Sequence, residues 1–407
     1  MMNIAHFSDL HYGTATLEEA DRCFGAAIDR AIAENVEAAI ISGDATDHGL
    51  DLHGPATLRL ISQVQRLAGH CPVLMLQGTF SHEPPGTLGV FQLLGTRHAV
   101  HVSERIEQVV LGAEGLWVAS EGWRFDELPQ GARVLISCVP TLNKARLAAC
   151  FGENAEMGVH LTALLAGFAL GNRAARDQGI PTAFVSHGTV FGSLNEHGIP
   201  MAGFDHEFTT GALFASGAQA VMLGHIHQHQ AWAQVGKNGQ QRIAYAGSIG
   251  RFHFGEQGEK GFLLWRLAAN SAEFSFVQTP ACRMVDLDFG ASPSLEDVRE
   301  AIQSHDIHGA HVRVRWTSAE EDRHFVDRTA LSRLLTQAGA AGIRLEGRIV
   351  PVVRARAPGI AQVGPLEEKV RTWASLTGVE ASCVLRCLEA LQQQAPAAIA
   401  ESILRDR

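Results

Sequence analysis

The sequence lacks a long apolar run, an excess of positive charge and a regular cysteine pattern. No stretch of eighteen apolar residues occurs among its 407 residues, so no membrane-spanning segment is expected. The net charge is −10, so strong nonspecific binding of nucleic acid through bulk charge is not expected either. The seven cysteines form no Cys-x-x-Cys pair, which disfavours a disulfide framework and a zinc ribbon.

The beginning of the sequence also lacks the basic region and the apolar core of a secretion signal. The short apolar run at residues 4–7 is typical of a first strand instead. We therefore expect a cytoplasmic protein with reduced thiols. Hydrophobic residues make up 46% of the chain and charged residues 19%, so a chain of this length can bury a sizeable core in two or three domains.

Short apolar runs alternate with helical periodicity in the first part of the chain. Residues 4–7, 36–42 and 73–76 are expected as strands, and residues 55–67 as one of the helices between them. A capping box over residues 16–19 is expected to start another helix. This alternation predicts the α/β fold class, with layered sheets flanked by helices.

The pattern changes after residue 280. Residues 281–357 contain a strand in which apolar residues alternate with Arg313 and Arg315, followed by a helix and another strand, so we expect a small α+β domain there. Residues 358–407 contain only short amphipathic patterns and are expected to form a helical segment. The predicted domains are therefore 1–280, 281–357 and 358–407.

Polar motifs with the chemistry of metal ligands stand at the ends of five expected strands. Because sites in open α/β sheets form at the carboxyl ends of strands, these side chains are expected to converge. In extended backbone, residues two apart face the same way, so each Asp-x-His or His-x-His pair is expected to reach one cation. Carboxylate and imidazole together suit divalent cations. The motif residues are Asp9, His11, Asp44, Asp47, His82, Glu83, His187, His225 and His227.

In this order, the motifs resemble those of the calcineurin-like metallophosphoesterases. In detail, the chain is similar to the SbcD-type nuclease subunit of bacterial double-strand-break repair. Residues 6–11 resemble its opening strand, and residues 245–249, 254–256 and 260–262 resemble the hairpin that closes its phosphoesterase domain. The resemblance implies a layered β-sandwich flanked by helices and a DNA-capping role for the α+β domain. The amphipathic patterns of the tail require packing on a partner or on the chain's own α+β domain, and we hypothesise that part of the tail binds a partner.

The resemblance also implies two cations that share Asp44. The family's third motif supplies an Asn ligand that this chain lacks. Ser81 takes its place if His82 is aligned with the family's histidine, and Thr79 takes it if Gly78 is aligned with the family's glycine. A hydroxyl is a poorer neutral ligand than an amide oxygen, so we expect the second cation to bind more weakly. The implied ligands are Asp9, His11, Asp44 and His227 for one cation, and Asp44, His187, His225 and Ser81 for the other.

A catalytic role is implied for His82, which matches the family's phosphate-facing histidine, and for Asp47 in the second motif. Two cations, Mn²⁺ above Mg²⁺, Fe²⁺ or Zn²⁺, would activate water for in-line attack on a phosphodiester. The implied partners are DNA, an SMC-like coiled-coil ATPase subunit and a second copy of the chain, at the nucleoid of a bacterium. Arg313 and Arg315 are candidates for contacts with DNA phosphates.

Two other functions stay open at this point. A small-nucleotide or protein phosphoesterase of the same superfamily would use the same motifs but would need no DNA-capping domain. A non-catalytic scaffold with a degraded second metal site is suggested by the missing Asn. The retention of the other ligand positions favours an enzyme, a metal-dependent DNA exonuclease or endonuclease.

Overall fold

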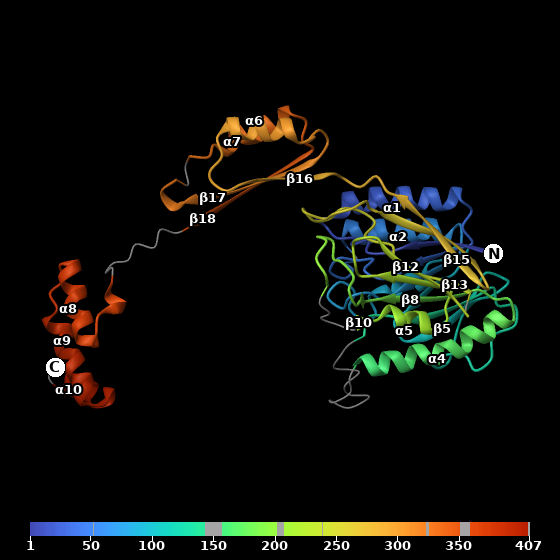
Figure 1. Cartoon of the computed structure of the whole chain (residues 1–407), viewed down its shortest axis with the longest axis horizontal. Helices are drawn as coiled ribbons and strands as arrows, with labels where there is room; N and C mark the ends of the chain where they lie inside the picture. The colour runs from blue at the N-terminus through green and yellow to red at the C-terminus, as the bar shows by residue number, and fades with distance from the viewer. Residues whose placement is uncertain are drawn as a thin grey trace. The chain divides into compact units, whose positions relative to one another are not determined.

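The computed structural model describes residues 1–51, 53–142, 157–201, 207–237, 239–322, 325–350 and 359–405. Two sheets form the centre of the first part of the chain (Figure 1). The first sheet, in spatial order, contains β15 (Ser271–Gln278), β14 (Gly261–Ala268), β1 (Met2–Phe7), β2 (Ala38–Ile41), β3 (Val73–Leu76) and β4 (Val100–Ser103). The second contains β12 (Gln230–Gly236), β13 (Gly239–Tyr245), β11 (Ala220–Gly224), β8 (Thr182–His187), β7 (Val134–Val139), β5 (Glu107–Leu111) and β6 (Trp117–Ala119).

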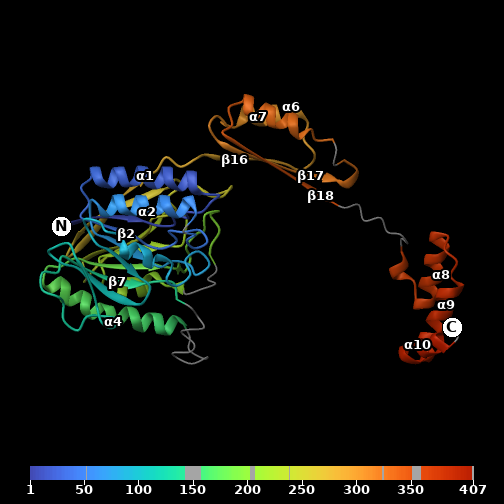
Figure 2. The same ribbon diagram turned by 180° about the vertical axis from the view of Figure 1, so that it is seen from behind.

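Helices cover the outer faces of both sheets, as Figure 2 shows from behind. On the first sheet lie α1 (Leu17–Ala33) and α2 (Pro55–Ala68), and on the second lie α4 (Met157–Asp177) and α5 (Thr210–Ala215). Three apolar layers result, because side chains alternate along each strand. In β1, Ile4 packs between the sheets, whereas Ala5 and Phe7 pack toward α1 and α2. The predicted α/β class, a layered sandwich flanked by helices, is confirmed.

Strand direction brings the functional loops to one edge. β1, β2, β3 and β4 run parallel to one another, as do β7, β8, β11 and β13. The loops that follow β1, β2 and β3 in one sheet therefore share an edge, and so do those that follow β8 and β11 in the other. β2, β3, β8 and β11 are buried along their whole length, which explains their largely apolar sequences.

Local capping differs from the sequence prediction at the start of α1. Thr16 precedes the helix, but its side chain does not cap it. Its hydroxyl donates to the carbonyl of His11 and accepts from the amide of Gly13. The predicted capping box is therefore wrong, because the hydroxyl is used to close the loop that carries His11.

The remaining described elements belong to neither of the two large sheets. A pair of short strands, β9 (Thr189–Val190) and β10 (Glu207–Phe208), lies outside the two large sheets, and β16, β17 and β18 form a third sheet. None of the described helices is long and apolar enough to cross a membrane. The other elements are β16 (Met284–Phe289), α6 (Leu295–Ser304), β17 (His311–Ala319), α7 (Arg328–Gln337), β18 (Gly342–Val350), α8 (Leu366–Thr377), α9 (Ser382–Gln393), α10 (Pro396–Arg405) and the 3₁₀ turns Thr87–Leu93, Glu320–Asp322 and Ile360–Gln362.

The chain divides into two compact units. The first consists of Met1–Asp288, Ser294–Arg315 and Arg328–Glu346, and the second of Phe289–Pro293, Trp316–Asp327 and Gly347–Arg407. The predicted domain boundary at 280/281 stays a prediction. The one at 357/358 lies outside the described residues.

Candidate metal centre

The backbone turns sharply at the candidate ligands. Asp9, His11, Asp44 and His225 have φ angles of 51°, 47°, 51° and 95°, a region that L-residues other than glycine rarely adopt. Asn35 is the other non-glycine residue with a positive φ among the described residues. The prediction that the Asp-x-His and His-x-His pairs lie on extended backbone is therefore wrong. Such concentrated strain is typical of functional sites.

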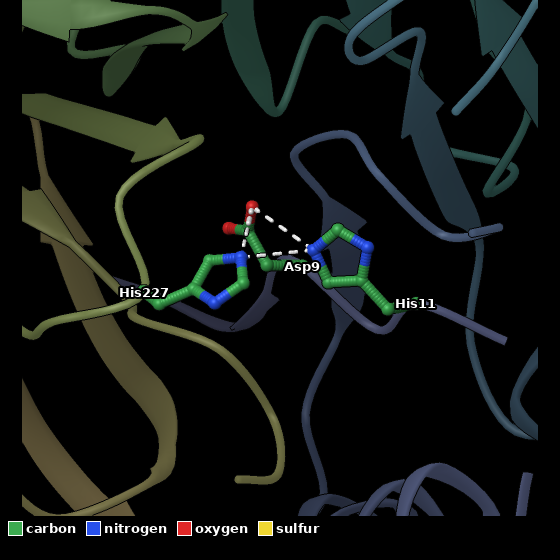
Figure 3. A group of neighbouring side chains, drawn as sticks. All are labelled: Asp9, His11 and His227. Atoms are coloured by element: carbon green, nitrogen blue, oxygen red, sulfur yellow. Dashed lines mark hydrogen bonds and ion pairs between the residues drawn. The ribbon is translucent and has the colours of Figure 1, made fainter. Parts of the chain in front are cut away.

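The first ligand group consists of Asp9, His11 and His227 (Figure 3). Candidate ligand atoms of the three residues all lie within 4.8 Å of one another, and Figure 3 shows the three side chains turned toward one another. The Nε2 atoms of His11 and His227 are 2.9 Å apart, and the Oδ1 atom of Asp9 lies 4.0 and 3.8 Å from them. Asp9 is fully buried and accepts from the hydroxyl of Ser8 and the amide of His225.

The second ligand group consists of Asp44, His187 and His225. The Oδ2 atom of Asp44 lies 3.2 Å from the Nε2 atom of His187. Asp44 also forms a group with His11 and His82, so it lies close to members of both ligand groups. Although His225 and His227 are two residues apart, the turn at His225 directs them to different groups. The resemblance implied this division, and the extended-backbone argument did not.

Thr79, rather than Ser81, lies at the second ligand group. The Thr79 amide donates to Oδ1 of Asp44 over 2.6 Å, and its hydroxyl donates to Oδ2 over 3.1 Å. The same hydroxyl lies 3.2 Å from Nε2 of His187. Ser81 is exposed, because the chain turns away after Thr79. The geometry thus favours the alignment on Gly78 and gives no support to Ser81 as a ligand.

His82 lies beside the groups at a more exposed position. Its Nδ1 atom donates to the carbonyl of Asp47, and the carboxylate of Asp47 lies 3.6 Å from that atom. Asp47 also lies 3.8 Å from Nδ1 of His11 and accepts from the exposed His48. Asp47 therefore lies beside both a candidate ligand and the candidate catalytic histidine, and its backbone carbonyl fixes the ring of His82.

Three glycines let neighbouring chain segments approach closely behind the ligands. A Cβ atom on Gly43 or Gly224 would collide with the ring of His187, and one on Gly78 would collide with Asp44. Gly43 also has a φ of 104°, so it provides a turn that other residues resist. The Gly-Asp and Gly-His pairs in the motifs are therefore packing requirements as well as turn signals.

Glu83 holds the second ligand group from behind, a role that the sequence did not reveal. It is fully buried and accepts from the amides of Ala45 and Thr46 with one oxygen and from that of Gly78 with the other. Burial, together with the charge of Asp44, raises the pKa of Glu83 to about 8. The residue ties the loop after β2 to the loop after β3, and its signal in the sequence was only that an acid follows His82.

The electrostatics of the groups are those of a cation site. Burial would raise the pKa of Asp44, but the adjacent His187 holds it well below its ordinary value. Although burial opposes it, Asp44 in turn raises the pKa of His187 to about 9. Burial and the neighbouring His227 lower the pKa of His11 to about 4. A carboxylate that holds a proton on its neighbouring imidazole is equally suited to hold a metal ion.

The donor set fits two divalent cations. Two imidazole nitrogens that face each other at 2.9 Å can share at most one proton, and His227 and His187 already direct their Nδ1 atoms toward other partners, Glu256 and the carbonyl of Ser42. Outer partners of this kind leave Nε2 as the ligand atom. Mixed nitrogen and oxygen donors accept Mn²⁺, Fe²⁺ and Zn²⁺, so the residues fit the metals but do not select one.

The predicted DNA-contacting arginines are engaged in ion pairs. Arg313 makes a two-pronged contact with Asp286, with distances of 2.6 and 2.8 Å, and Arg315 lies 2.8 Å from Asp288. These partners neutralise the basic face that the alternation on β17 suggested. A phosphate would have to compete with the aspartates for each guanidinium, so the geometry gives these two residues no support as phosphate ligands.

Comparison with known proteins defines the class of this centre. The calcineurin-like phosphoesterase family model matches residues 2–229, and the chain belongs to that family. No curated protein matches the chain.

Two solved structures are similar to the chain. A dimetal phosphatase from Danio rerio is 10% identical, with a TM-score of 0.38, over 67% of this chain and 98% of its own. A 5'-nucleotidase precursor from Thermus thermophilus is 14% identical, with a TM-score of 0.37, over 69% of this chain and 55% of its own.

Proposed function

We propose that this chain is a dinuclear-metal-dependent nuclease that hydrolyses phosphodiester bonds in DNA during repair. The observation that carries the proposal is the position of Asp44. Candidate ligand atoms of Asp44 and His11 lie within 4.8 Å of each other, and Oδ2 of Asp44 lies 3.2 Å from Nε2 of His187. A shared carboxylate of this kind suits two cations that act on one phosphate. Support for DNA as the substrate comes from the SbcD-like hairpin and from the elements that follow β15, which a phosphatase of small substrates does not need.

The residues of the site have distinct roles in this reaction. The ligands would be Asp9, His11, His227 and Asp44 for one cation, and Asp44, His187 and His225, with Thr79 beside them, for the other. When bound, the cations supply Lewis-acid stabilisation of the phosphate and a nucleophile near neutral pH. His82, fixed through Nδ1 by the carbonyl of Asp47, is left with Nε2 to give a proton to the departing sugar oxygen. We expect Mn²⁺ as the natural metal.

The substrate class is tested with the full chain and Mn²⁺. We expect it to shorten linear duplex or single-stranded DNA and to hydrolyse bis-p-nitrophenyl phosphate, with little activity on the monoester p-nitrophenyl phosphate. Hydrolysis of the two small substrates with no change in DNA length would contradict the nuclease proposal and favour a small-nucleotide or protein phosphoesterase. No hydrolysis of any substrate with Mn²⁺, Mg²⁺, Fe²⁺ or Zn²⁺ would favour the scaffold.

The helical tail supports the proposal of a coiled-coil ATPase partner. α8 buries Ala374 and α9 buries no residue, while Leu376 and Leu391 are each more than half exposed. Short amphipathic helices with exposed apolar side chains are suited to docking on another helix. We expect Leu376→Glu and Leu391→Glu in the full chain to weaken capture of an SMC-like ATPase. Leu58 on α2 is similarly exposed, so Leu58→Glu is the control. Capture of the ATPase by all three variants to the same extent as by the wild-type chain would contradict the proposal.

A further inference from the structure

Behind His227 lies a fully buried pair of opposite charges that the reaction above does not use. The side chains of Glu256 and Lys260 are both 0% exposed, and the Nζ atom of Lys260 lies 2.7 Å from Oε2 of Glu256. The other carboxylate oxygen, Oε1, lies 3.5 Å from Nδ1 of His227 and accepts from the amide of His253. Burying two charged groups costs desolvation free energy even when they pair with each other, so the burial of Glu256 and Lys260 suggests a role beyond stability.

Lys260 also donates to the backbone of the same histidine and to a neighbouring serine. Its Nζ atom donates to the carbonyl of His227 over 3.0 Å and to the hydroxyl of Ser248 over 2.9 Å. The ammonium group therefore fixes the backbone of His227 while the carboxylate that it holds contacts the ring. Lys260 directly precedes β14, which pairs with β1, so the pair is anchored to the sheet that carries Asp9.

We propose that Glu256 is a positioning residue for the metal ligand His227, and that Lys260 holds Glu256 in place. A carboxylate at Nδ1 fixes the proton on that nitrogen, which leaves the lone pair of Nε2 directed at Asp9 and His11. Such outer partners orient a ligand histidine and increase its basicity. The inference rests on the two-metal centre of the proposed function, but not on DNA as the substrate.

The corresponding histidine of the second group has a neutral partner, at a shorter distance. Nδ1 of His187 donates over 2.8 Å to the carbonyl of Ser42, which is neutral. A charged acceptor raises the basicity of an imidazole more than a neutral one does. Glu256 should therefore strengthen the Asp9–His11–His227 group selectively, in addition to the difference that Thr79 makes in the other group.

The alternative is that Glu256 and Lys260 only stabilise the loop before β14. A second buried carboxylate provides the matched control. Glu107 is 2% exposed and lies 2.9 Å from the ring of His101, with Arg105 as its cationic partner, but it belongs to none of the ligand groups. Glu256→Gln and Glu107→Gln thus make the same chemical change to a buried Glu–His pair, one beside the metal centre and one elsewhere.

The test is calorimetric titration of the metal-free full chain with Mn²⁺. In Glu256→Gln we expect one of the two association constants to fall about 10–100-fold, the range for a lost outer partner, and the other to stay at the wild-type value. Glu107→Gln should change neither. With Co²⁺ in place of Mn²⁺, the visible absorption of the tighter site should change only in Glu256→Gln.

Several outcomes would overturn the proposal. Wild-type constants and an unchanged Co²⁺ spectrum in Glu256→Gln would show that the carboxylate does not position His227. An equal fall of both constants, with a lowered melting temperature of the metal-free variant, would show a general structural role. A wild-type chain that binds no Mn²⁺ would refute the metal centre itself, whereas one that binds Mn²⁺ and leaves DNA intact would refute only the nuclease function.

Discussion

Asp44 belongs to one ligand group and lies close to His11 of the other, but the two groups are built differently. The Asp9–His11–His227 group has all the ligands that the resemblance implies, and a carboxylate stands behind one of them. The Asp44–His187–His225 group has the Thr79 hydroxyl beside it, and a backbone carbonyl behind its histidine. The comparison teaches that a two-metal site can lose symmetry in its outer partners as well as in its ligands, so the two cations should bind with unequal affinity.

Removal of Asp44 should affect both ligand groups at once. Because Asp44 is the residue close to both groups, Asp44→Ala should abolish the organisation of both cations together. Metals in such sites supply several kcal/mol of transition-state stabilisation, so phosphodiesterase activity should fall on the order of 10³-fold or more. Steady-state hydrolysis of bis-p-nitrophenyl phosphate measures this. Wild-type turnover in the variant would rule out a two-metal reaction.

His82 should affect neither ligand group if it acts on the phosphate and does not bind a metal ion. His82→Ala should slow turnover by roughly 10²–10⁴-fold, the range for a general acid, while both Mn²⁺ binding steps remain. Parallel turnover and calorimetric measurements separate the two roles. Loss of one binding step would make His82 a ligand, which its closeness to His11 and Asp44 also permits.

The packing behind the second group can be broken without changing a ligand. Gly78→Ala would place a methyl group against Asp44, and such overpacking costs about 1–3 kcal/mol of unfolding free energy. Gly89→Ala is the control, because nothing lies within 4 Å of the added carbon there. Urea denaturation of both variants gives the comparison. Equal unfolding free energies of the two variants would mean that the loop after β3 accommodates the added carbon without strain.

Thr79→Asn should make the two groups more alike. The new amide oxygen can serve the second cation as the family's Asn does, while the Thr79 backbone amide still donates to Asp44. We expect the weaker Mn²⁺ association constant to rise roughly tenfold, a change comparable to that of one outer partner, and the stronger one to stay the same. An increase in the stronger association constant instead would show that residue 79 contacts the cation of the Asp9–His11–His227 group.

The sequence predicted the layers and the convergence of the motifs, because buried parallel strands have continuous apolar sequences and their ends share an edge. It failed where local geometry decides. Nothing in the spacing of Asp9 and His11 shows a left-handed turn, and alternation on β17 cannot show that aspartates on β16 neutralise Arg313 and Arg315.

The outer partners were also beyond prediction. Glu256 is 29 residues from His227 in the sequence, and only the fold brings them together. The choice between Thr79 and Ser81 depended on which residue the loop after β3 directs inward. An alignment on Gly78 or on His82 was equally consistent with the sequence, and the turn after Thr79 decides it.

The most direct test of an unequal two-metal centre around Asp44 is anomalous diffraction from crystals of the full chain, soaked in low and then high Mn²⁺. We expect one peak among Asp9, His11 and His227 at low concentration. At high concentration a second peak should join it among His187, His225 and Thr79, with Asp44 between the two. A single peak at all concentrations, or a peak at Asp47, His48 and His82 instead, would contradict this account.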